Sequence, residues 1–170
     1  MNDEPLFSSA HAALTFAFRY SMQQYEPTIL ARLMARVAGL GSGKGLVGLD
    51  GAAQAGFILR ELDALPHNER NIIVARMSVD PKEMLTAMMA LIPQATASLG
   101  TGVHNRRMVD ALVQRYFGRK GNLKILAEQF GVHPNTMTQR WVCIRRMLRE
   151  IEDRAMERIE NLLLEAGIVG

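Results

Sequence analysis

No glycine or proline interrupts the chain between Pro134 and Gly167, and no other stretch of the sequence runs so long without one. Apolar residues recur through this stretch, first at alternating steps of four and three, in a stripe made of Met137, Trp141, Ile144, Leu148, Ile151, Ala155, Ile159 and Leu162. The pattern predicts one helix of about 30 residues, or roughly 45 Å at 1.5 Å per residue. The early steps resemble a heptad seam, which shifts by one residue where Arg158 takes the expected apolar position.

This seam has two interpretations that the sequence leaves open. It can pair with a second copy of the chain, which would make the protein a homodimer, or it can pack on the N-terminal helices of the same chain. The part of the helix from residue 151 is acidic, with six acidic and two basic residues between positions 150 and 170. We therefore interpret it as an arm for packing or dimerisation.

The rest of the chain also shows helical periodicity, so the expected fold class is all-α. Helices are predicted over 9–25, from Pro27, over 51–62, over 67–77, from Asp80–Pro81 to Pro93, over 105–117, and between the cap Asn122 and Gly131. The small face of the 51–62 helix (Ala52, Ala55, Gly56 and Leu59) predicts a close helix–helix contact. Residues 39–48 contain five glycines and are predicted to form a linker, and 94–103 a connector.

Charge is unevenly distributed along the chain. Residues 100–149 carry ten basic and two acidic side chains, whereas residues 1–99 carry eight basic and nine acidic ones. The formal net charge of +3 therefore comes from one segment with a net charge of +8. A basic block this local is the expected footprint of a phosphate-binding surface. We divide the chain into a helical N-terminal region, 1–99, and a C-terminal domain, 100–170.

Composition excludes several classes of protein. The chain is 48% hydrophobic and 22% charged, as expected of a soluble globular protein, and no stretch is apolar enough to cross a membrane. The N-terminus lacks the layout of a secretory signal, and the single Cys143 fits a reducing cytoplasm. Four scattered histidines give no metal site, and Gly45 follows Lys44 where a phosphate-binding loop needs Ser or Thr. We expect a non-enzymatic protein without cofactor or metal.

Residues 126–141 have the spacing of a helix–turn–helix. Ala127 stands four residues before Gly131, and the apolar Val132 and Met137 follow that glycine. A small alanine lets two helices approach closely, and glycine adopts the positive φ of the turn at little cost. The second helix would then present hydrogen-bonding side chains outward.

Site residues are assigned by their expected facing. Four residues are candidates for base contacts, namely His133, Asn135, Thr138 and Gln139. Seven cations are candidates for phosphate contacts: Arg119, Lys120, Lys124, Arg140, Arg145, Arg146 and Arg149. Trp141 lies in the apolar stripe, so packing in the core is the expected role for it.

The segment LAEQFGVHPNTMTQRWVCIRRML resembles the helix–turn–helix of sigma-factor C-terminal domains and of LuxR-type regulators, over residues 108–150. The whole layout, all-helical with a late basic helix–turn–helix, is similar to phage and prophage regulators, among them the Q-type late-gene antiterminators. The first resemblance implies sequence-specific binding to double-stranded DNA. The second implies a transcription regulator of a phage or mobile element that acts with RNA polymerase.

Two other classes of function remain open from the sequence. A DNA-binding structural or partition protein shares the helix–turn–helix without acting on transcription. A helical protein-interaction adaptor uses the basic face for an acidic protein partner. Residues 1–99 are expected to serve self-association or contact with a partner.

Overall fold

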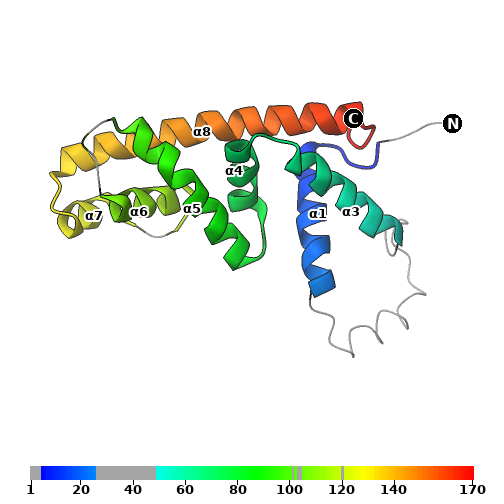
Figure 1. Ribbon diagram of the computed structural model, residues 1–170, viewed down its shortest axis with the longest axis horizontal. Helices are drawn as coiled ribbons and strands as arrows, with labels where there is room; N and C mark the ends of the chain where they lie inside the picture. The colour runs from blue at the N-terminus through cyan, green and yellow to red at the C-terminus, as the bar shows by residue number, and fades with distance from the viewer. Residues whose placement is uncertain (1–4, 26–48, 101, 103–104, 120) are drawn as a thin grey trace. The chain divides into compact units, whose positions relative to one another are not determined.

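The computed structural model describes residues 5–25, 49–100, 102, 105–119 and 121–170 (Figure 1). Within these ranges the chain is helical, with an isolated parallel bridge between Phe7 and Val169 and no strand. The helices are α1 (Ala10–Tyr25), α3 (Leu49–Asp63), α4 (His67–Met77), α5 (Pro81–Ser98), α6 (Arg106–Tyr116), α7 (Leu123–Gln129) and α8 (Pro134–Glu165). The all-α prediction is confirmed, and so is the long terminal helix, which has 32 residues.

The chain forms two compact units. One contains the residues up to Ala64 together with Ile159–Gly170, and the other contains Leu65–Arg158. The helix α8 contributes its residues up to Arg158 to the second unit and the remainder to the first. The predicted division into residues 1–99 and 100–170 concerns function, which these compact units do not test, and it stays a prediction.

The first unit is built on the packing of α1 against α3. Its buried side chains include Ala10, Ala13, Leu14, Ala17 and Phe18 of α1, Ala55, Ile58 and Leu62 of α3, and Ile159 and Leu163 of α8. Beside α1, the backbone N–H of Phe7 donates to the carbonyl of Ile168 at 3.1 Å. The stripe predicted for the end of α8 is wrong by one residue, because Leu163 is buried and Leu162 is only half-buried. Successive residues turn by about 100°, so Leu163 lies about 40° round the helix from Ile159, whereas Leu162 lies about 60° away on the other side.

In the second unit α5 packs against both α4 and α6. In α4, four consecutive residues from Ile72 to Ala75 are buried, so this helix is enclosed on several sides. The predicted start of α5 is confirmed, because the Asp80 side chain accepts a hydrogen bond from the backbone N–H of Lys82 at 2.9 Å. The predicted start of α6 at Asn105 is confirmed too, because the Asn105 side chain caps the helix by accepting from the backbone N–H of Met108 at 3.1 Å.

The prediction that Pro93 ends its helix is wrong. Helix α5 continues through Pro93 to Ser98, so residues 94–98 belong to a helix and not to a connector. A proline in a helix leaves the carbonyl four residues earlier without its partner, and here that residue is Met89, which is 52% exposed. Water can therefore satisfy that carbonyl, while Leu91, Ile92 and Ala95 keep the other face of α5 buried.

The small face predicted for α3 is only partly buried, because Ala55 lies in the core but Gly56 does not. Gly56 is exposed, and no atom lies within 4 Å of the position that a Cβ would take. The buried face of α3 contains Ala55 of the predicted set together with Ile58 and Leu62. The helix predicted from Pro27 and the linker 39–48 lie outside the described residues.

We expect the substitution Gly56→Ala to stabilise the protein by about 0.5–1 kcal/mol, because alanine lowers the conformational entropy of the unfolded chain and meets no neighbour in α3. Urea unfolding followed by circular dichroism measures this. The matched control is Gly131→Ala, where φ is +62° and space is equally open. There the left-handed backbone makes alanine destabilising by about 1 kcal/mol. Equal effects at the two sites would contradict the argument.

Candidate nucleic-acid interface

The predicted two-helix segment is present as α7, a four-residue turn and the start of α8. Asn122 begins α7 by accepting a hydrogen bond from the backbone N–H of Lys124 at 2.9 Å. At the other end, Gly131 has a φ of +62°, and the N–H of Val132 reaches back to the carbonyl of Ala127 at 2.9 Å. Together with the bond from the N–H of Gly131 to the carbonyl of Glu128 at 3.3 Å, it forms a Schellman C-cap, which ends the helix in a sharp turn because glycine takes the left-handed conformation at no steric cost.

The positions predicted to hold the two helices together are removed from solvent. Ala127 is 1% exposed and Met137 is fully buried, with Leu126 at 7%. Val132, in the turn, is half-buried. The motif is therefore packed on its inner side, and its outer side is mostly polar, with Ile125 of α7 as an exposed apolar residue.

Helix α6 is linked to α8 by two arginine contacts. Arg140 places a guanidinium nitrogen 3.2 Å from the sulfur of Met108. Arg115 stacks its guanidinium 5.2 Å from the ring centroid of Trp141. Both contacts join side chains more than 25 residues apart in sequence, so no local pattern indicated them.

The four candidates for base contacts are all exposed on the turn and the first turns of α8. Two of them are bonded within the protein, since the Thr138 hydroxyl donates to the carbonyl of Pro134 at 3.0 Å and His133 Nδ1 accepts from the N–H of Asn135 at 3.3 Å. The side-chain amides of Asn135 and Gln139 have no hydrogen-bond partner among the described residues. They are therefore the groups freest to bond to a ligand.

Of the seven cations predicted for phosphates, five are exposed: Arg119, Lys124, Arg145, Arg146 and Arg149. Arg140 is half-buried against α6 and does not join them, because its guanidinium is engaged by Met108. Lys120 lies outside the described residues. Arg149 stands 4.0 Å from Asp153, and both side chains are about 70% exposed, so this pair is weak.

The first turn of α6 adds two exposed cations, Arg106 and Arg107, that the assignment from sequence left out. Arg115 at the end of α6 was also left out, and it is half-buried over Trp141. All three belong to the segment with a net charge of +8, so the charge count contained the signal that could have found them.

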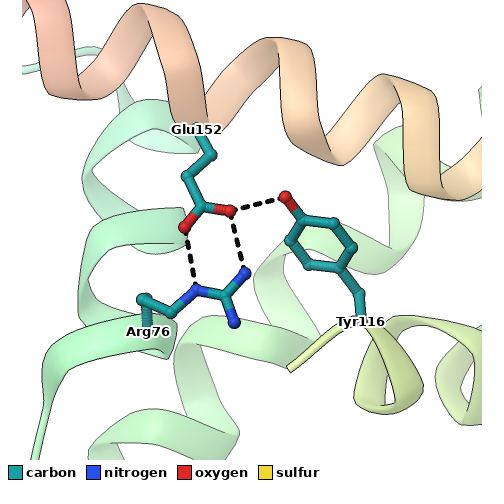
Figure 2. Close-up of polar contacts among 3 residues, drawn as sticks. All are labelled: Arg76, Tyr116 and Glu152. Atoms are coloured by element: carbon teal, nitrogen blue, oxygen red, sulfur yellow. Dashed lines mark hydrogen bonds and ion pairs between the residues drawn. The ribbon is translucent and has the colours of Figure 1, made fainter. Parts of the chain in front are cut away.

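A charged cluster of Arg76, Tyr116 and Glu152 joins α4, α6 and α8 (Figure 2). Arg76 forms a bidentate pair with Glu152, with Nε 2.8 Å from Oε1 and Nη2 2.9 Å from Oε2. The Tyr116 hydroxyl donates to the same Oε2 at 2.5 Å. The Arg76 guanidinium also lies 5.0 Å from the ring centroids of Tyr116 and Phe117. A further ion pair joins α4 to α8, with Arg158 Nε 3.1 Å from Glu69 Oε2.

The protonation of this cluster follows from its contacts. Burial raises the pKa of the Tyr116 hydroxyl well above its ordinary value, and the carboxylate of Glu152 raises it further. Burial also acts to raise the pKa of Glu152, but hydrogen bonds from Arg76 and Tyr116 outweigh it and hold that pKa below the ordinary value. Glu152 is thus an anion and Tyr116 a neutral donor over the physiological range.

Comparisons with known proteins do not assign the chain to a family. No protein-family model matches it, and no curated protein is significantly similar to it in sequence. Among the helices within the described ranges, none is both long and apolar enough to span a bilayer. The same residues contain no group of three or more His, Cys, Asp or Glu side chains placed to hold a metal ion.

The substitution Glu152→Gln should lower the free energy of unfolding at neutral pH by about 1–2 kcal/mol, because a partly exposed charged hydrogen-bond network loses its anion. The folded pKa of Glu152 is depressed, so its contribution is complete above the unfolded pKa of about 4.3 and is lost as the pH falls through the folded pKa. Urea titrations between pH 3 and pH 7 should show the two proteins converging at acid pH.

The matched control for this prediction is Glu157→Gln, which changes an exposed carboxylate on the same helix. It should leave the unfolding free energy within about 0.5 kcal/mol of the original at every pH. If Glu152→Gln behaved like this control, the cluster would not be holding α8 against α4 and α6.

Proposed function

We propose that this protein is a regulator of transcription that binds double-stranded DNA through α7 and α8. The observation that carries the proposal is the outer face of α8, where exposed amides are followed along the helix by the exposed arginines Arg145, Arg146 and Arg149. An α-helix of this kind fits the major groove of B-form DNA, where base edges lie between two rows of phosphates.

The chemistry of the face supports a division of roles. The amides of Asn135 and Gln139 have no partner among the described residues, and an amide side chain can donate to adenine N7 and accept from adenine N6 at once. The arginines and Lys124 carry charge without directional constraint from the fold, which suits contacts with phosphate oxygens. His133 and Thr138 lie on the same exposed surface and complete the set that we propose to face the DNA.

A role in transcription rests on the resemblance of the α7–α8 segment to sigma-factor and LuxR-type helix–turn–helices. We further propose that the protein comes from a phage or mobile element and works with RNA polymerase, as the similarity in layout to Q-type antiterminators implies. In this proposal the region 1–99 contacts polymerase or a second copy of the chain. The protein would act in the cytoplasm and catalyse no reaction of its own.

Selection of bound duplexes from a random pool tests the proposal directly. We expect enrichment of a defined sequence, bound with a logarithmic affinity that falls linearly as the logarithm of salt concentration rises. A palindrome with half-sites about one helical turn apart would indicate a dimer, and an asymmetric site a monomer. Salt-sensitive binding without any enriched sequence would instead indicate a structural or partition protein. Failure to bind any duplex would leave only the adaptor function and would overturn the proposal.

Two substitutions on α8 should distinguish contacts that read the base sequence from contacts that only position the protein on the DNA. Gln139→Ala should lower the preference for one base pair by about 1–3 kcal/mol and leave binding to unrelated duplexes unchanged. Arg146→Ala should weaken binding to all duplexes and reduce the salt slope by about one. Both residues are exposed, so the fold should tolerate both changes. Fluorescence anisotropy with labelled duplexes at several salt concentrations measures these effects.

The control is Arg154→Ala, which removes an exposed arginine from the acidic half of α8. It should leave affinity and salt slope unchanged. A uniform loss of affinity on Gln139→Ala, equal for all sequences, would show that Gln139 does not read a base.

A further inference from the structure

In the basic first half of α8, one aliphatic side chain lies on the polar outer face. Val142 is 54% exposed, and the residues one turn away on either side, Thr138 and Gln139 before it and Arg145 and Arg146 after it, are exposed as well. It belongs to a different face from Met137, Ile144 and Leu148, which are fully buried. Val142 is thus an apolar group among hydrogen-bond donors, in the middle of the surface that we propose to face DNA.

The physical properties of valine suit a specific contact at this place. A β-branched side chain in a helix keeps one χ1 rotamer, so the two methyl groups of Val142 have a defined position before any ligand binds. Contact then costs little side-chain entropy. Valine cannot bond to a phosphate, so its contribution to this surface would have to come from burying apolar area.

We propose that Val142 reads the 5-methyl group of a thymine, with α8 lying lengthwise along the major groove. This inference rests on the proposed function. Thymine alone among the four bases presents a methyl group in that groove, so an aliphatic side chain there has a single matching base. Val142 therefore contributes to sequence specificity beyond the amides of Asn135 and Gln139.

The spacing along α8 agrees with this arrangement. Seven residues separate Asn135 from Val142, which is about 10 Å at 1.5 Å per residue. Base pairs in B-form DNA follow at about 3.4 Å, so this distance covers roughly three steps. Asn135, Gln139 and Val142 would then address neighbouring base pairs, while Arg149 would reach phosphates beyond them. A helix that entered the groove only by its first turn would not bring Val142 to a base.

A second exposed aliphatic residue provides the contrast. Ile125 on α7 is 61% exposed, but its exposed neighbours include Lys124 and Glu128, which carry opposite charges. The cationic surroundings of Val142 complement a polyanion and would have to be desolvated against an apolar protein surface. DNA is therefore the partner that the charges around Val142 favour.

The test replaces each thymine of the selected duplex, one at a time, by deoxyuridine, which lacks only the 5-methyl group. With the original protein we expect about a fourfold loss of affinity at one position, the size of one buried methyl group. Val142→Ala should bind the thymine duplex about fourfold more weakly and become insensitive to deoxyuridine at that position. Its salt slope should stay unchanged, because no phosphate contact is lost.

Ile125→Ala is the matched control and should keep the full sensitivity to deoxyuridine. Threonine has nearly the same shape as valine, and one methyl group remains. In Val142→Thr the loss of affinity caused by deoxyuridine should therefore be about half of that in the original protein, on a logarithmic scale. If no thymine position is sensitive in the original protein, or if Val142→Ala keeps the sensitivity, the inference is overturned. Selected, salt-dependent binding would then still support the proposed function, whereas the absence of any selected duplex would refute that function itself.

Discussion

Burial of one face of α8 is the constraint on which the proposed interface depends. Met137, Ile144, Leu148 and Ile151 are at most 1% exposed, and their burial fixes the rotation of the helix about its own axis. A helix fixed in this way turns its opposite face away from these buried contacts, since successive residues turn by about 100°. The positions of Gln139, Val142, Arg145 and Arg146 toward solvent are a direct consequence.

The same rotation decides which charged residues of α8 face the core and which face solvent. Glu152 turns inward and is neutralised by Arg76, so this carboxylate adds no repulsion to the outer surface. The arginines between positions 145 and 149 turn outward and keep their charge. Along its length α8 also changes from a basic segment at residues 140–149 to an acidic one from residue 150, within a single continuous helix. The internal cluster also explains why Arg76 is not available as a phosphate contact.

Local signals predicted much of the fold and failed where distant contacts decide. The caps at Asp80 and Asn122, the helix start at Asn105 and the turn at Gly131 were predicted correctly, because each depends on hydrogen bonds within a few residues. The prediction that Pro93 ends its helix was wrong because the free-energy cost of a proline in a helix depends on whether water reaches the carbonyl left without a partner. The prediction of a close helix–helix contact at Gly56 was wrong because a small residue is compatible with such a contact but does not require one.

The sequence by itself determined that the chain is helical, where most helices begin and end, and that positive charge is concentrated between residues 100 and 149. These properties depend on periodicity, caps and composition, which are local or additive. Only the tertiary structure decided which cations remain free: Arg140 is held against Met108, Arg115 stacks on Trp141, and Arg76 pairs with Glu152. The physical reason is that the partner of a charged side chain is set by the packing of helices far apart in sequence, which neither spacing nor charge count records.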